Sequence, residues 1–165
     1  MHDLMPERIV RLEADAVVLL DQRRLPDDEV ELRCASAAEV ADAISTLAIR
    51  GAPAIGVAAA YGLALAAAGG EDLDTAYELL ASSRPTAVNL RWALDEIRDD
   101  PTPERARALH EEEVERCLRM GRHAADLLGT RARRASPLRV LTHCNTGGLA
   151  TGGYGSALGA VRTAW

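Results

Sequence analysis

The chain has 165 residues, the size of one domain or of a small domain with part of another, and 48% of them are hydrophobic, which is enough for a core. Its net charge of -6 argues against a nucleic-acid partner, because binding nucleic acid requires a basic face. Cys34, Cys117 and Cys144 form no CxxC pair, which argues against a disulfide framework or a metal site and fits a reducing cytoplasm. The segment MHDLMPERIV lacks a basic stretch followed by an apolar one, so we expect no export signal.

The first part of the chain predicts a small antiparallel sheet. Between residues 7 and 33, the runs RIVRLE, AVVLLD and EVELRC alternate apolar and polar residues and are separated by turn-forming segments. The spacing then becomes helical. Ser36 and Glu39 form a capping box, which predicts a helix that carries Leu47 on its apolar face and ends near Arg50.

Residues 51 to 70 carry no charge and are long enough to cross a bilayer. Most of them are glycine or alanine, so the segment is much less hydrophobic than a typical membrane span. We therefore favour a buried helix from Pro53 to about Ala68 and expect no membrane partner. Gly56 begins a stripe of small residues, four apart, that would let another backbone approach closely.

Three further helices are predicted over 72–82, 86–98 and 103–128, and Gly129 is expected to end the last one. The charged stretch TRARRASP follows, and it is the best candidate for a domain boundary. The predicted division is an N-terminal domain at 1–130, a linker at 131–137 and the start of a second, truncated domain at 138–165.

The second domain is expected to begin with a strand, LRVLTH, followed by a glycine-rich turn and a helix from about Tyr154. This order is typical of the opening unit of a doubly wound parallel sheet. The predicted fold class is therefore α/β: a small N-terminal domain of a short antiparallel sheet plus helices, followed by the first strand-helix unit of a Rossmann-like domain. A parallel strand needs neighbours, so we expect that the remainder of this domain is missing from the chain.

Cys144 follows the predicted strand, where ligands of open α/β sheets bind. Amide groups of the next turn and the start of the next helix would favour a thiolate there, which makes a reactive thiol plausible. An inert, buried cysteine is the alternative. The loop GGLATGGYG that follows could approach a phosphate, but it lacks the dinucleotide-binding spacing, and its glycines could equally serve helix packing.

RGAPAIG, residues 50 to 56, places Arg50 and Gly51 at a predicted helix start, a favourable position for an anion. Arg50 could instead cap the preceding helix. Arg84 lies in SRPTAVNL before another predicted helix and could also be an ordinary surface residue. HEEE at 110–113, like His123, is interpreted as part of a solvated helix face rather than a metal site, because consecutive residues point around a helix.

Four stretches together resemble the S-methyl-5-thioribose-1-phosphate isomerase family, over essentially the whole chain and in the family's order. They are LLDQRRLP, AIRGAPAIGVAAAYGLALA, SRPTAVNLRWAL and VLTHCNTGGLATGGYGSALGAVR. The similarity is to the N-terminal half of family members. It implies an aldose–ketose isomerase of methionine salvage that acts on a small-molecule sugar phosphate without metal or organic cofactor, usually as a homodimer.

The resemblance also implies roles for particular residues. Arg50, with Gly51 and Ala52, and Arg84 would hold the substrate phosphate, and Cys144 would be the catalytic thiol. The family's second catalytic group, an aspartate, belongs to the C-terminal half, so we expect that these residues cannot turn over substrate without a complementing C-terminal half. Two alternatives stay open: an isomerase of ribose 1,5-bisphosphate, and a non-catalytic member similar to the regulatory subunits of a translational guanine-nucleotide exchange factor.

Overall fold

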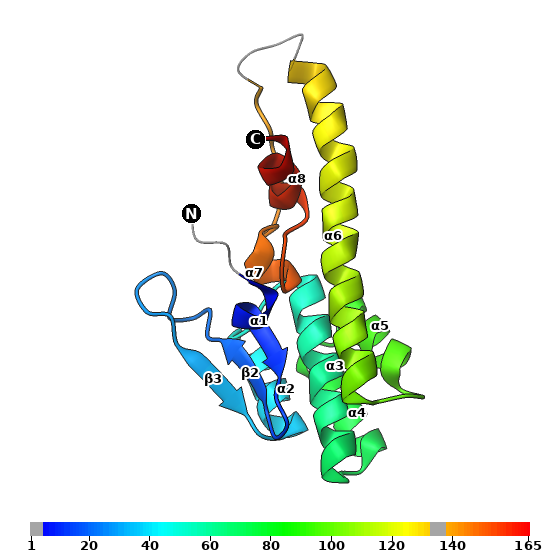
Figure 1. The fold of residues 1–165 in the computed structure, drawn as a ribbon. Coiled ribbons are helices and arrows are strands. Elements are labelled where there is room, and N and C mark those ends of the chain that lie inside the picture. The colour runs from blue at the N-terminus through cyan, green and yellow to red at the C-terminus, as the bar shows by residue number, and fades with distance from the viewer. Residues whose placement is uncertain (1–4, 133–137) are drawn as a thin grey trace.

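The computed structural model describes residues 5–132 and 138–165. Within these ranges a three-stranded antiparallel sheet and helices form an α/β structure, which confirms the predicted class (Figure 1). The elements, in chain order, are α1 (Pro6–Ile9), β1 (Val10–Leu12), β2 (Val17–Leu20), β3 (Glu31–Cys34), α2 (Ala37–Ser45), α3 (Ala52–Gly69), α4 (Leu73–Ser83), α5 (Val88–Ile97), α6 (Pro103–Ala132), α7 (Gly148–Thr151) and α8 (Ala157–Ala164).

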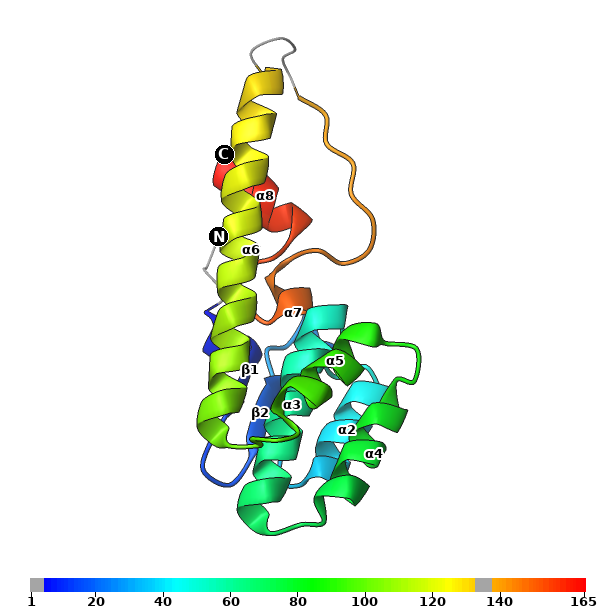
Figure 2. The same cartoon turned by 90° about the vertical axis from the view of Figure 1, so that its right-hand side faces the viewer.

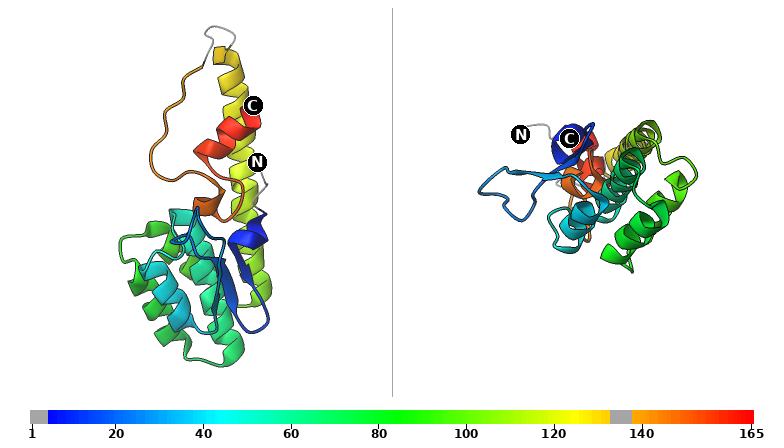
Figure 3. Two further views of the ribbon diagram at one scale, coloured as in Figure 1. Left: turned by 90° about the vertical axis from the view of Figure 1, so that its left-hand side faces the viewer. Right: turned by 90° about the horizontal axis from the view of Figure 1, so that it is seen from below.

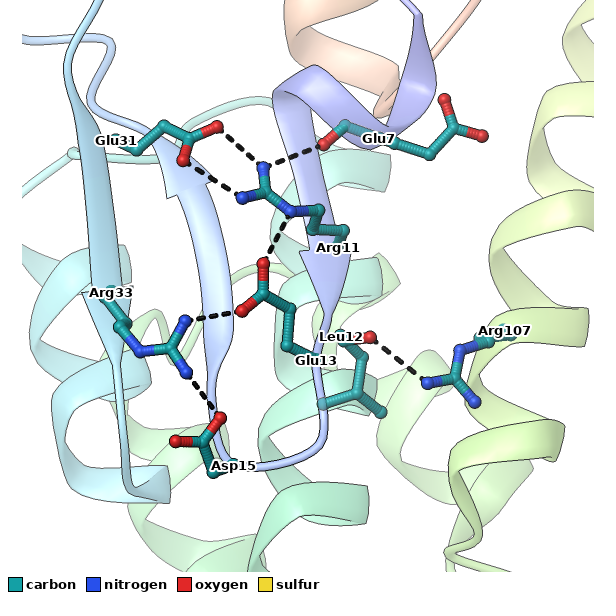
Figure 4. Close-up of polar contacts among 8 residues, drawn as sticks. All are labelled: Glu7, Arg11, Leu12, Glu13, Asp15, Glu31, Arg33 and Arg107. Atoms are coloured by element: carbon teal, nitrogen blue, oxygen red, sulfur yellow. Dashed lines mark hydrogen bonds and ion pairs between the residues drawn. The ribbon is translucent and has the colours of Figure 1, made fainter.

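The sheet has the order β1-β2-β3, and β2 is buried on both faces. On the outer face, Arg11 of β1 and Arg33 of β3 flank Val18 of β2 in the strand register, so the arginine stems cover this valine. The guanidinium groups pair with carboxylates around them: Arg11 with Glu13 and Glu31, and Arg33 with Glu13 and Asp15 (Figure 4). Arg33 in particular lowers the pKa of the Glu13 carboxyl.

Helix α3 is the centre of the molecule, as predicted for the charge-free segment. Every residue from 54 to 66 is buried, between the sheet on one side and α4 and α5 on the other (Figure 3). The helix is long and apolar enough to cross a bilayer, but it is mostly covered by protein. The small-residue stripe has the expected use at Gly56, where an added Cβ would lie 2.9 Å from the backbone oxygen of Asn89 in α5.

The long helix α6 packs against α3 and α5 with one end and against α8 with the other (Figure 1). The predicted stop at Gly129 is wrong, because the helix continues to Ala132. Glycine lowers helix propensity without requiring a break, and nothing near Gly129 forces one. Most of the predicted linker at 131–137 lies outside the described residues.

Residues 138 to 147 contain no strand, although 138–143 were expected to form one. Figure 2 shows this segment as an arc that leads down to α7 and stands away from the helices. No strand of the described sheet pairs with it, and Leu141 is 98% exposed. Only the helical part of the predicted strand-helix unit, α8, is therefore formed.

Two other expectations need correction. The helix after Ser36 ends at Ser45 rather than near Arg50: the Ser45 and Thr46 hydroxyls bond the Asp42 carbonyl, and Leu47 takes a left-handed conformation with φ of 64°.

The HEEE stretch is not wholly solvated either. His110 and Glu113 are buried, because α3 and the segment around α7 cover this side of α6, whereas Glu111 and Glu112 are exposed, as is His123 further along α6.

Candidate functional site

The turn at residues 50–52 leads into the N-terminus of α3. Gly51 is the N-cap residue with φ of 107°, a conformation that side-chain-bearing residues rarely adopt. A Cβ on Gly51 would lie 2.4 Å from both the Cα and the carbonyl oxygen of Ala150 in α7. Glycine is thus required here for two reasons, and the turn is in direct backbone contact with the segment that follows Cys144.

Arg50 and Ala52 flank this glycine and are both exposed. Within the described ranges, the Arg50 guanidinium makes no hydrogen bond or ion pair, and the residue is exposed beside the start of α3. The first turn of a helix also presents amide groups that have no partner inside the helix. The combination suits a phosphate or another small anion.

Arg84 is the C-cap residue of α4 and is half-buried. Its carbonyl accepts a hydrogen bond of 2.9 Å from the Ala87 amide, which closes the turn into α5. Through the Gly56–Asn89 contact, the first turn of α5 lies against α3 near its N-terminal end. The Arg84 side chain makes no hydrogen bond or ion pair within the described part of the chain, and none connects it to Arg50 or Cys144.

Cys144 lies on the extended segment before α7 and is exposed, whereas Cys34 and Cys117 are buried. It has φ of 64°, an uncommon conformation for a residue with a Cβ. The chain just beyond it is anchored, since the Thr146 carbonyl accepts a hydrogen bond of 2.9 Å from the Ser156 amide near the start of α8. The thiol is therefore accessible and attached to a fixed point of the backbone.

Gln22 connects this segment to the rest of the fold. It is only 1% exposed, its amide nitrogen donates to the Leu149 carbonyl of α7 at 2.9 Å, and its backbone N–H donates to the Ala48 carbonyl at 2.8 Å. Its side-chain oxygen is buried and has no partner among the described residues. The residue belongs to the LLDQRRLP stretch, where its signal was a polar side chain directly after a buried strand, but the sequence alone assigned it no role.

The structure thus brings together two of the predicted stretches, the 50–52 turn and the segment after Cys144, through the contact between Gly51 and Ala150. Arg84 lies at the end of α4, in the turn before α5, and the start of α5 packs against α3 at Gly56. In the described ranges, no three His, Cys, Asp or Glu side chains gather as they would around a metal ion. A groove of about 660 Å³ lies elsewhere, between α1, β1 and α6, and includes none of the predicted site residues.

Comparisons with known proteins identify relatives of the chain. The model of the Initiation factor 2 subunit family matches residues 48–165. A methylthioribose-1-phosphate isomerase of Stutzerimonas stutzeri is 47% identical, with 98% of this chain and 51% of that protein covered. One of Pseudomonas aeruginosa is 48% identical over 88% of this chain and 46% of that protein. The chain therefore spans about half the length of these relatives.

Two solved structures are similar to the fold. The 5-methylthioribose 1-phosphate isomerase of Pyrococcus horikoshii superposes with a TM-score of 0.78 at 33% identity, over 96% of this chain and 51% of that one. The delta subunit of translation initiation factor eIF-2B from A. fulgidus has a TM-score of 0.70 at 40% identity, over 94% of this chain and 50% of that one.

Proposed function

The chain belongs to the Initiation factor 2 subunit family, and from this premise we propose that it is the phosphate-binding, thiol-bearing part of an isomerase that converts 5-methylthioribose 1-phosphate to 5-methylthioribulose 1-phosphate. The observation that carries the proposal is the backbone contact between Gly51 and Ala150. This contact joins the start of α3, next to Arg50, to α7, which follows the exposed Cys144 along the chain. The relatives named methylthioribose-1-phosphate isomerase supply the substrate.

In this proposal Arg50 and Arg84 bind the phosphate, with Gly51 and Ala52 contributing backbone groups at the start of α3. A guanidinium pairs with phosphate through two parallel hydrogen bonds, which fixes the orientation of the sugar as well as its position. Neither arginine has a competing carboxylate partner within the described residues. Both charges are therefore available to the ligand.

The reaction needs an acid and a base on either side of the sugar. Because phosphate occupies the anomeric oxygen, the ring cannot open to a free aldehyde. An acid must therefore protonate the ring oxygen as its bond to C1 breaks, while hydrogen moves from C2 to C1 and a base takes the proton of the C2 hydroxyl, which becomes the ketone. We assign one of these two roles to the Cys144 thiol. The family resemblance supplies the other, an aspartate of the C-terminal half.

The same proposal includes the wider organisation of the protein. Residues 1–130 form the N-terminal domain, and 138–165 begin a Rossmann-like domain, whose first strand, 138–143, forms when neighbouring strands pair with it. The active assembly is a homodimer or includes a complementing C-terminal half. Three cysteines without disulfide partners suit the cytoplasm.

The test is an isomerase assay on the polypeptide as its gene encodes it, with methylthioribose 1-phosphate as substrate and ribose 1,5-bisphosphate as competitor. Replacing the acid-base thiol, Cys144→Ala, should lower kcat by about 10²- to 10⁴-fold. Arg50→Ala and Arg84→Ala should each raise KM by about ten- to a hundredfold, as expected for lost charged hydrogen bonds. Arg122→Ala is the matched control, because Arg122 is exposed on α6 and has no partner among the described residues.

A non-catalytic role is the second candidate, and the likeness to the eIF-2B delta subunit favours it. A scaffold of that kind would bind a sugar phosphate or a protein partner without chemistry at the thiol. In that case Cys144→Ala would leave binding of the sugar phosphate or of the protein partner unchanged. An exposed thiol on the segment that leads into α7, which contacts the 50–52 turn, favours the enzyme over the scaffold.

A further inference from the structure

Three buried groups from separate elements form a hydrogen-bonded chain that ends on the segment after Cys144. The Tyr61 hydroxyl of α3 lies 2.9 Å from Nδ1 of His110 in α6, and Nε2 of His110 lies 2.6 Å from the carbonyl oxygen of Gly152, just after α7. His110 is 6% exposed, and its ring meets that of Tyr61 edge to face. Neither side chain has a role in the proposed chemistry.

The partners fix which nitrogen carries the proton. A carbonyl oxygen only accepts, so Nε2–H of His110 donates to Gly152. In the neutral ring Nδ1 is then an acceptor, and the Tyr61 hydroxyl donates to it. Every polar atom of the imidazole is satisfied in this state, and burial lowers the pKa of His110, which agrees with a neutral ring.

The carbonyl that receives this bond belongs to a turn with little freedom. Gly152 is the C-cap of α7 with φ of 71°, and a Cβ placed on it would lie 3.1 Å from Nε2 of His110. The imidazole therefore sets where the chain reverses after α7. The same short helix is held against Gly51 through Ala150.

We infer that His110 is a positioning residue: by holding the Gly152 carbonyl, it keeps α7 against the 50–52 turn. It thereby fixes where the segment that carries Cys144 enters α7. Its effect on turnover rests on the proposed function. Its effect on the α7 segment does not, because that effect follows from the hydrogen bond alone. Tyr61 orients the His110 ring and therefore acts on Gly152 through His110.

The alternative is that His110 only fills space in the core. Three variants distinguish a positioning role from a space-filling role. His110→Gln keeps an N–H donor at the place of Nε2. His110→Asn has a side chain too short for its donor to reach Gly152, and His110→Phe keeps a ring without a donor. Hydrogen–deuterium exchange of residues 147–155 measures the segment directly. Activity on methylthioribose 1-phosphate is measured in parallel, on the polypeptide as its gene encodes it.

Loss of one buried hydrogen bond should raise exchange of residues 147–155 by about 10- to 100-fold in His110→Phe and His110→Asn, with kcat reduced and KM changed less. His110→Gln should restore exchange and kcat to within about threefold of the parent. Equal exchange in the parent and His110→Asn, or no rescue in a folded His110→Gln protein, overturns the inference. If the parent itself does not turn over the substrate, the proposed function fails, while the exchange rates still decide the role of His110.

Discussion

The three thiols of the chain lie in different environments. Burial raises the pKa of Cys34 and of Cys117 to about 11, whereas the side chain of Cys144 is open to solvent. Thiolate is the reactive form, so the two buried cysteines are protected both by access and by protonation at neutral pH. The fold alone therefore predicts that the three thiols differ in reactivity, whether or not the protein is an isomerase.

Iodoacetamide should accordingly modify Cys144 in the folded protein at pH 7 and leave Cys34 and Cys117 unmodified until the protein is unfolded. Mass spectrometry of tryptic peptides, sampled over time, gives the three rates. Cys144→Ser should abolish labelling of the native state. Labelling of Cys34 or Cys117 at a rate similar to that of Cys144 would mean that their burial is not as described.

Gly51 is the residue where a single methyl group should do most harm to the proposed site. Gly51→Ala introduces a Cβ into the backbone of Ala150 at a left-handed position, so we expect a loss of at least about 2 kcal/mol in the free energy of unfolding. Gly129→Ala is the matched control. It lies within α6 with nothing near its Cβ position, and should be neutral or stabilise by up to about 1 kcal/mol.

Urea denaturation of the two variants measures both effects. A Gly51→Ala protein as stable as the parent would show that the 50–52 turn and α7 are free to separate. The contact that connects the proposed phosphate-binding turn to the segment after Cys144 would then not hold the two together.

Asp21 gives the fold a predictable pH dependence. Its carboxylate accepts two hydrogen bonds from the Arg23 guanidinium, of 2.8 and 2.7 Å, and this pairing lowers the pKa of Asp21. The ionised carboxylate therefore stabilises the fold at pH values above its unfolded pKa, about 3.9, and the contribution is lost as the pH falls through the lower folded value.

Asp21→Asn should thus reduce the free energy of unfolding at pH 7 by up to about 1 kcal/mol and flatten its decline below about pH 4. Asp27→Asn, an exposed change in the same loop, is the control and should leave the profile unaltered. Denaturation curves between pH 3 and pH 7 provide the comparison. Superimposable profiles for Asp21→Asn and the parent would contradict the role given to this pair.

At the scale of elements, local signals predicted most of the fold. Alternation marked the three strands, and capping residues and helical spacing marked α2 to α6 and α8, because amphipathic elements carry their own periodicity. The strand expected at 138–143 did not form, since a strand depends on partners that local sequence does not contain. The short helices α1 and α7 also escaped prediction.

The residues of the candidate site also fall into those that local sequence features indicate and those that depend on distant parts of the chain. Cys144, Arg50 and Arg84 could be proposed from the sequence, since a thiol before a glycine-rich turn and a guanidinium before a helix are local features, and the family resemblance implied their roles. The roles of Gln22 and His110 could not, because each depends on a carbonyl more than forty residues away along the chain, as the separations of 127 and 42 residues show. His110 was assigned to solvent because helix position alone does not reveal which neighbours will cover it.

The capping box of α2 is the local signal that can be tested most directly. The Glu39 amide donates to the Ser36 hydroxyl at 3.2 Å, and the Ala35 amide donates to the Glu39 carboxylate at 2.7 Å. Ser36→Ala should therefore cost about 1 kcal/mol in the free energy of unfolding. Ser82→Ala, on the exposed face of α4, should cost nothing or stabilise slightly; equal losses in both variants would rule out a specific capping effect.

At the scale of the whole molecule, the chain has two unequal parts. Around α3, the sheet and helices bury a continuous core. Around the far end of α6, α8 is the main contact, and the segment leading to Cys144 exposes Leu138, Val140 and Leu141. Apolar side chains exposed in a row on a strand-length segment indicate a surface that another part of the protein covers. The proposed thiol lies at the end of that segment.

A C-terminal half should both cover this surface and supply the second catalytic group. On the proposed function, the 165-residue chain alone lacks the aspartate that would act with Cys144, so its kcat should be lower by about 10²- to 10⁴-fold than that of an intact isomerase. Mixing it with a polypeptide that corresponds to the C-terminal half of the Stutzerimonas stutzeri relative should restore turnover. Robust turnover by the 165 residues alone would refute the split of catalytic groups.

Leu141→Asp shows whether restoration depends on the exposed segment. Leu141 is 98% exposed, so the change should leave the free energy of unfolding of the 165-residue chain within about 0.5 kcal/mol, but a carboxylate buried between paired strands should prevent restoration. Leu79→Asp, on the outer side of α4, is the control and should permit it. If both variants are restored equally, the partner half pairs somewhere other than residues 138–143, and the Rossmann-like domain does not begin there.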